Sequence, residues 1–283
     1  MLEQLRQRLQ ALQKPAGIDN DPGCLPFGIA AIDEALGGGL ARGALHEIAA
    51  PGEAHLAAAT GFVLGVASSP SPRVRGEGRD EGVLRQSALS ERPPHPTSLR
   101  AVDLSPQAGR GKKIIWIAED MALAESGALH GPGLDAFNLA PERLLTVAAG
   151  HRRDLLWAME EALRCRAIDA VIGELRHGEL DAVAVRRLSL AATNSGALAL
   201  LLRSAPARDA STAATRWIVG AAASSPTYGP GPPRFAAQLV RNRRGPVGSW
   251  ILEWSDTDER FILAAPALPV AAPALDRPHR KVA

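Results

Sequence analysis

Apolar runs and amphipathic segments alternate along this chain in a way that predicts strands separated by helices. Nearly unbroken apolar runs occur at ALHEIA (44–49), KKIIWIAED, ERLLTVAA, IDAVIGEL and ALALLLRS. Between them, apolar residues recur at helical spacing in DLLWAMEEALR and in DAVAVRRLSLAATNS, which Gly196 closes. Strands that are apolar throughout and alternate with helices are typical of a parallel sheet covered on both faces. We therefore predict an α/β fold.

The pattern changes in the last third of the chain, where helices no longer separate the strands. RWIVGAA, RFAAQLVRNRR and GSWILEW are apolar or alternating runs joined by segments rich in Gly and Pro. We expect these three strands to extend the sheet in an antiparallel arrangement.

Three segments are predicted to lie outside the core, which spans residues 25–265. Residues 1–20 carry leucines at helical spacing and predict an amphipathic helix that packs on the core or on a partner. Residues 69–113 are rich in Pro, Gly and Arg and follow neither a helical nor a strand period, so we expect a disordered insertion. Residues 266–283 predict a flexible tail rich in Ala and Pro.

Composition narrows the classes of function. The chain has 283 residues, 46% of them hydrophobic, and a formal net charge of +2, which implies no polyanionic partner by itself. Cys24 and Cys165 lack the spacing of metal ligands, so we expect buried thiols and no zinc site or disulfide framework. The sequence shows neither a membrane span nor the apolar centre of a signal peptide, which favours a cytoplasmic protein.

One segment has the layout of a phosphate-binding loop. The predicted helix AAIDEAL stops at Gly37, Gly38 and Gly39, and the strand ALHEIA follows. A turn at Pro51 and Gly52 then leads into an alanine-rich helix. Phosphate-binding loops use this order of strand, turn and helix because the free backbone N–H groups at the helix start face the anion.

The segment GIAAIDEALGGGLARGALHEI resembles the RecA family, and later segments narrow the resemblance to the ImuA group. These later segments are LLWAMEEALR, AVIGEL, RRLSLAA and GPPRF, followed by LVRNRRG and GSWILEW. The resemblance covers most of residues 25–260 apart from the insertion. It implies a RecA-like three-layer core and a role in damage-inducible (SOS) mutagenesis and translesion synthesis. The partners that it implies are an ImuB-like relative of the translesion polymerases and RecA.

The loop itself departs from the RecA pattern. It consists of Ala50, Pro51, Gly52, Glu53, Ala54, His55, Leu56 and Ala57. Leu56 stands where the family has a phosphate-binding lysine, and Ala57 stands where a hydroxyl holds magnesium. His55 replaces a glycine, and Glu53 adds a negative charge. Since phosphoryl transfer depends on that lysine and magnesium, we expect a degenerate Walker A loop without ATP hydrolysis, cofactor or metal; weak ATP binding stays open.

The resemblance also assigns the remaining candidate residues. Glu119 matches the acid that activates water in RecA-like ATPases, and Glu174 stands where the family has its magnesium-associated Asp. Each is a relic or a polar end of a strand. Arg241-Asn242-Arg243 lies where RecA proteins carry a Lys-Asn-Lys that reaches a neighbouring subunit. With Arg234 and Arg244, these arginines predict contacts with a partner or with DNA, unless they form a solvated basic strand.

The function expected from these features is that of a non-catalytic accessory protein. It would act by protein–protein binding within an error-prone polymerase complex. One alternative is an ATP-binding, DNA-dependent ATPase or recombination regulator of the RecA type, which DNA-stimulated hydrolysis dependent on Glu119 would reveal. A second is a SulA-like cell-division inhibitor, which filamentation on overexpression would favour.

Overall fold

The structure, a computed structural model, describes residues 22–69, 113–165, 167–176, 178, 180–206, 211–224 and 231–265. The predicted helix over residues 1–20, nearly all of the predicted insertion over 69–113, and the predicted tail over 266–283 lie outside these ranges. Within them, no helix combines the length and apolar character needed to cross a membrane.

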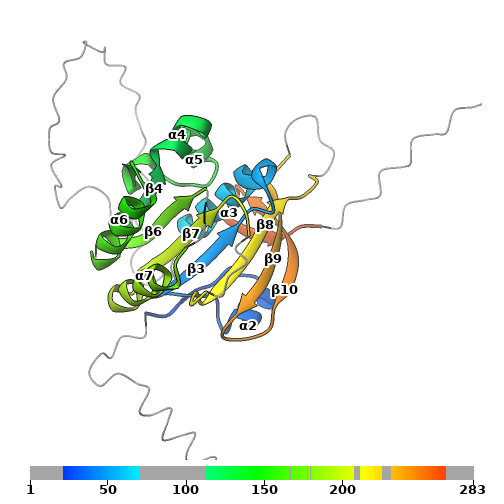
Figure 1. Cartoon of the computed structure of the whole chain (residues 1–283). Helices are drawn as coiled ribbons and strands as arrows, with labels where there is room; N and C mark the ends of the chain where they lie inside the picture. The colour runs from blue at the N-terminus through cyan, green and yellow to red at the C-terminus, as the bar shows by residue number, and fades with distance from the viewer. Residues whose placement is uncertain are drawn as a thin grey trace, which may run out of the picture.

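A nine-stranded sheet forms the centre of the described molecule (Figure 1). In chain order its strands are β3 (Ala44–Ala49), β4 (Lys113–Glu119), β5 (Leu144–Ala149), β6 (Ile168–Leu175), β7 (Leu198–Arg203), β8 (Thr215–Ala221), β9 (Arg234–Asn242), β10 (Gly248–Ser255) and β11 (Arg260–Leu263). Their spatial order is β11-β10-β9-β8-β3-β7-β6-β4-β5. The strands from β5 to β8 in this order run parallel, and β9, β10 and β11 follow antiparallel. This is the predicted α/β arrangement with a mostly parallel sheet.

The antiparallel region begins one strand later than the sequence predicts. The strand RWIVGAA corresponds to β8, which pairs parallel with β3, with Ile48 opposite Trp217. Only its other neighbour, β9, is antiparallel to it. The sequence pattern identifies a strand from its own residues, whereas its direction relative to β3 depends on how the chain returns to the start of the sheet.

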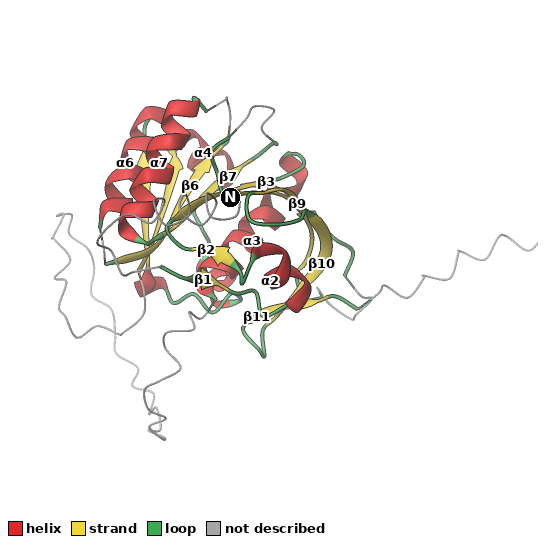
Figure 2. Cartoon of the chain, turned by 90° about the horizontal axis from the view of Figure 1, so that it is seen from below, coloured by secondary structure: helices red, strands yellow, loops and turns green. Residues whose placement is uncertain are grey.

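Helices cover both faces of the sheet (Figure 2). The helices are α2 (Ala30–Leu36), α3 (Leu56–Ser68), α4 (Asp120–Ser126), α5 (Gly131–Asp135), α6 (Arg152–Arg164) and α7 (Ala182–Ser195), and short 3-10 turns span Glu53–His55 (η1) and Pro141–Arg143 (η3). The helix α2 ends as predicted, with Gly37 in the left-handed conformation at φ 71°. The short helices α4 and α5 and a separate antiparallel pair, β1 (Cys24–Leu25) with β2 (Leu40–Ala41), are additional to the prediction.

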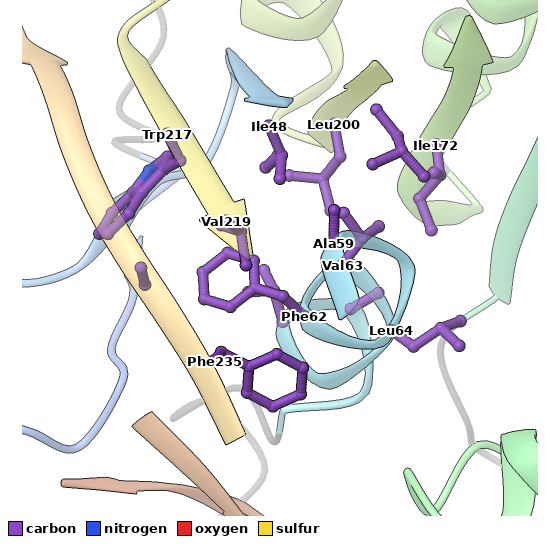
Figure 3. Packing of buried hydrophobic residues seen from close by; sticks show 14 of the residues in the cluster. Ile48, Ala59, Phe62, Val63, Leu64, Ile172, Leu200, Trp217, Val219 and Phe235 are labelled. Atoms are coloured by element: carbon purple, nitrogen blue, oxygen red, sulfur yellow. The ribbon is translucent and has the colours of Figure 1, made fainter. Parts of the chain in front are cut away.

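The helix α3 lies in an aromatic core on one face of the sheet (Figure 3). The ring of Phe62 lies between 5.3 and 6.2 Å, centroid to centroid, from four other aromatic rings, those of Phe27, Trp217, Phe235 and Phe261. Gly65 faces Phe261 and Trp254: a Cβ atom there would lie 2.5 Å from Cζ of Phe261. The absence of a side chain at Gly65 therefore allows α3 to approach the aromatic rings closely.

The helices α6 and α7 lie side by side on the opposite face. Leu155, Met159 and Leu163 of α6 and Leu188 of α7 are buried in a second apolar cluster. Charged residues occupy much of the outer side of both helices. These helices therefore show the amphipathic pattern predicted for them, in contrast to the deeply buried α3.

Candidate functional site

The segment predicted as a phosphate-binding loop lies at the carboxyl end of the parallel strands. It leaves β3 at Ala50, whose N–H donates to the carbonyl of Arg203 at the end of β7 (2.9 Å). The turn η1 then leads into α3, with the N–H of His55 donating to the carbonyl of Gly52 (2.9 Å). The order of strand, turn and helix is thus the predicted one (Figure 1).

The side chains at the start of α3 face different environments. Leu56 is 6% exposed and joins the aromatic core, whereas Ala57 is exposed on the surface of the helix. His55 accepts a hydrogen bond at Nδ1 from the N–H of Ala221 (3.1 Å), which ties the loop to the end of β8. His55 therefore has a structural partner, and neither Leu56 nor Ala57 offers a positive charge or a hydroxyl.

A hollow of about 360 Å³ lies beside the loop and contains an ionic network. The guanidinium of Arg176 lies 3.0 Å from Oε1 of Glu174 and 3.8 Å from Oε2 of Glu53. The indole N–H of Trp116 donates to the other oxygen of Glu174 (3.2 Å). Arg176 and Glu174 are both nearly buried. Two carboxylates thus surround one guanidinium, so a phosphate entering here would meet negative charge next to a cation that is already paired.

Arg176 is not among the site residues predicted from the sequence, although a signal for it exists. Arg176 follows β6 by one residue, and β6 lies two strands from β3 in the sheet. Because the carboxyl ends of parallel strands meet at one edge, a basic residue just after a strand is a candidate for the same site as the loop. The structure brings Glu174 to this site, whereas Glu119 at the end of β4 is not among the residues that line the hollow.

The strand β3, which leads into the loop, carries two buried polar side chains. His46 donates from Nε2 to the carbonyl of Ala41 (2.9 Å) and accepts at Nδ1 from the hydroxyl of Thr215 (2.8 Å), which in turn accepts from the indole of Trp217 (3.0 Å). Burial lowers the pKa of His46 from 6.5 to about 4, against the raising effect of the hydrogen bond to Ala41. His46 is therefore a neutral structural residue at neutral pH.

Glu47, the next residue on β3, is equally buried but is held by a charged partner. The Nε–H of Arg216 donates to one carboxylate oxygen of Glu47 (2.8 Å), and the hydroxyl of Ser211 donates to the other. Since successive residues of a strand face opposite sides of the sheet, His46 and Glu47 support the two faces separately. Both residues stabilise the strand beneath the loop.

The structure buries Arg234, one of the arginines predicted to contact a partner or DNA. Its side chain is 5% exposed and pairs with Glu253, with Nε donating to Oε2 at 2.6 Å. It begins β9, whereas the other candidate arginines lie at or beyond the end of that strand. A sequence pattern shows that a residue is basic but does not show that an acid on the adjacent strand covers it.

The remaining arginines gather at the turn between β9 and β10. Arg241 donates to the carbonyl of Ser211, while Arg243 and Arg244 are exposed. Asn242 shapes the turn: its side-chain amide donates to the carbonyls of Ala35 (2.7 Å) and Pro246 (3.0 Å). Asn242 pairs with Thr215 at the start of β8, so this turn lies at the opposite end of that strand from the loop. The arginines and the loop thus form separate sites.

The two cysteines are free, but the expectation that they are buried is wrong. Cys165 is exposed because it caps the end of α6, and Cys24 is partly exposed beside Arg244, whose Nη1 lies 3.3 Å from its sulfur. Across the ranges that the structure describes, no group of three or more His, Cys, Asp or Glu side chains is arranged to hold a metal ion.

Comparison with known proteins finds sequence similarity to Protein ImuA. No family model matches the sequence. Protein ImuA from two strains of Caulobacter vibrioides is 29% identical over 157 residues, which cover 51% of this chain. The chain matches 61% of the length of these relatives. A crystal structure of the RadB recombinase superposes with a TM-score of 0.48 at 12% identity, covering 84% of this chain and 98% of that chain.

Proposed function

We propose that this chain, a homologue of Protein ImuA, is a non-catalytic RecA-like accessory protein of damage-inducible mutagenesis. It would act in the cytoplasm by binding the proteins of an error-prone polymerase complex during translesion synthesis. The observation that carries the proposal is the charge of the hollow beside the loop, where Glu53 and Glu174 surround Arg176.

The electrostatics of the hollow oppose the binding of a triphosphate with magnesium. A working loop supplies a lysine for the β- and γ-phosphates and a hydroxyl for the metal ion. Here the corresponding side chains are a buried leucine, Leu56, and the methyl group of Ala57. For a phosphate to use Arg176 instead, it would have to displace the Glu174 carboxylate from a nearly buried pair. We therefore expect negligible hydrolysis and weak nucleotide binding.

The proposed partners are an ImuB-like relative of the translesion polymerases and RecA. A RecA-like core presents the surfaces through which such domains associate whether or not its nucleotide site works. Loss of the ATP site is therefore compatible with a role in assembly.

Co-purification tests the proposed assembly. The full-length chain is mixed with its ImuB-like partner, with RecA, and with both, and each mixture is analysed by size-exclusion chromatography without nucleotide. We expect a stable complex with at least one of them. The loop variant Glu53→Ala serves as the matched control and should assemble equally well, because the proposed binding does not use the hollow. Failure of the wild-type chain to associate in all three mixtures would contradict the proposal.

The exposed turn at Arg243 and Arg244 is proposed as a contact with a partner or with DNA. The variant Arg243→Ala, Arg244→Ala is compared with Arg260→Ala, which removes an exposed arginine elsewhere. If DNA is the ligand, the double variant should bind single-stranded DNA more weakly. The slope of log affinity against log salt concentration should become shallower by about one to two released counterions. If a protein is the ligand, the double variant should weaken the co-purified complex instead. An unchanged affinity in both assays would remove this turn from the proposal.

A further inference from the structure

The helices α6 and α7 enclose a groove that the proposed function does not use. It has a volume of about 620 Å³ and runs between the amino-terminal halves of the two helices. Leu156 and Trp157 line it from α6, and Leu188 lines it from α7. Trp157 is 62% exposed, although tryptophan is usually well buried in a folded protein. An exposed tryptophan beside an apolar groove is typical of a surface that buries it against a partner.

The rim of the groove is basic where the helices themselves do not favour positive charge. Arg152 and Arg153 occupy the first turn of α6, directly after His151 at its N-cap, and Arg187 lies in the second turn of α7. A helix amino terminus carries a partial positive charge and is stabilised by acidic residues, so arginines in the first turn of α6 destabilise that helix end. Asp154 supplies an acidic residue in the same turn, so Arg153 adds a positive charge that this helix end does not require.

The acidic residues in the groove are already engaged. Glu160 is held by Arg164 (2.6 Å) and by Arg187, and Asp181 caps α7 by accepting from the N–H of Val183 (3.1 Å). Arg153, in contrast, makes no ion pair with any residue of the described ranges. The groove therefore combines an apolar floor with the positive charge of Arg153, which pairs with no carboxylate of the described residues.

We propose that this groove binds a short acidic, amphipathic segment of a partner protein. Its apolar side chains would pack on Leu156 and Trp157, and its carboxylates would pair with Arg153. Tryptophan and arginine are the residues that most often dominate such interfaces, and a groove between two helices fits a peptide that presents one apolar side. A protein segment is favoured over DNA because Leu156 and Trp157 give the groove apolar surface, which apolar side chains next to carboxylates would cover.

The inference deepens the proposed function, since it rests on the idea that the chain works through partners, and its test needs neither RecA nor an ImuB-like protein. A phage-displayed random library of peptides about 16 residues long is selected on the full-length chain. We expect the selected peptides to be rich in Asp and Glu together with Leu or aromatic residues. If this selection fails, the groove proposal fails, but the co-purification result still tests the proposed function. If the selection succeeds, it does not replace a co-purification that failed.

Matched variants locate the binding of the selected peptide. The dominant peptide is labelled, and its affinity is measured by fluorescence anisotropy. Trp157→Ala and Arg153→Glu should each weaken binding about tenfold or more, since both residues contact the peptide. Two controls change exposed residues that do not line the groove: Leu190→Ala, also on α7, and Arg260→Glu. Both controls should bind normally, and a circular dichroism spectrum like that of the wild-type chain should show that each variant is folded.

Four outcomes would overturn the inference. The selection yields no peptide that binds; it yields neutral or basic peptides; or the groove variants bind the peptide as well as the controls do. In the fourth, an oligothymidylate of about 30 nucleotides competes with the peptide and loses affinity in Arg153→Glu, which would assign the groove to nucleic acid instead.

Discussion

The two helical layers cover the same sheet with different surfaces. The helix α3 is buried among aromatic rings, and its first residue, Leu56, points into that core. The helices α6 and α7 bury only one side and expose Trp157 and a group of arginines on the other. In a phosphate-binding loop the helix start would provide the charged chemistry, yet here the charge and the exposed aromatic residue lie on the opposite layer.

This difference shows in which layer packing limits the amino-acid substitutions that the fold tolerates. On the α3 side, substitutions are limited by packing, because aromatic rings surround the helix. On the α6–α7 side, exposed residues such as Trp157 make few contacts with the core, so packing limits their substitution much less. Loss of the α3 layer should unfold the protein, whereas changes to the outer α6–α7 surface should alter binding alone.

The largest effect is expected for Phe62→Ala on α3. Its ring contacts four other aromatic rings, and removing it leaves a cavity that α3 cannot close. We expect the free energy of unfolding to fall by about 4 kcal/mol. Urea denaturation followed by circular dichroism measures it. A loss below about 1 kcal/mol would show that the aromatic core is loosely packed.

A smaller loss is expected when the buried carboxylate on the other face loses its partner. Arg216→Ala leaves Glu47, which is 2% exposed, with the Ser211 hydroxyl but without the guanidinium. A buried charge left unpaired costs about 3 kcal/mol. The double variant Glu47→Gln, Arg216→Ala should recover part of this loss in the same denaturation experiment. No recovery would mean that the packing of Arg216, and not its charge, stabilises the strand.

Because His46 is buried on the α3 face, we expect it to make the free energy of unfolding depend on pH. Burial lowers its pKa to about 4, so the unfolded chain binds a proton between about pH 6.5 and pH 4 while the folded chain does not. Stability is therefore lost as the pH falls through this range, by about 3 kcal/mol in total. Urea denaturation at several pH values, with His46→Asn as the comparison, isolates this contribution. Parallel pH profiles for the two proteins would contradict it.

The smallest effect on stability is expected for Trp157→Ala. Because this side chain is 62% exposed, the free energy of unfolding should change by less than about 0.5 kcal/mol. The same denaturation experiment as for Phe62→Ala provides the direct comparison between the two layers. A loss similar to that of Phe62→Ala would make Trp157 part of the core and remove the contrast between the layers.

Much of the fold follows from the sequence because its signals are local. The apolar runs and the glycine after AAIDEAL locate the strands and α2, and the order of strand, turn and helix locates the loop. The sequence does not reveal features that depend on distant neighbours. Examples are the parallel direction of β8, the burial of Arg234 by Glu253, and the meeting of Arg176 with Glu53. Trp157 belongs to the same group, since helical spacing separates the buried side from the outer side but does not show a groove.

The most direct test of the central claim is ATP turnover by the purified full-length chain with magnesium and single-stranded DNA. Leu56 and Ala57 provide neither the lysine nor the hydroxyl, and Arg176 is paired with Glu174. We therefore predict no phosphate release above that of the Glu119→Gln variant, with or without DNA. Hydrolysis that DNA stimulates and Glu119→Gln abolishes would contradict the account and identify the chain as an active ATPase.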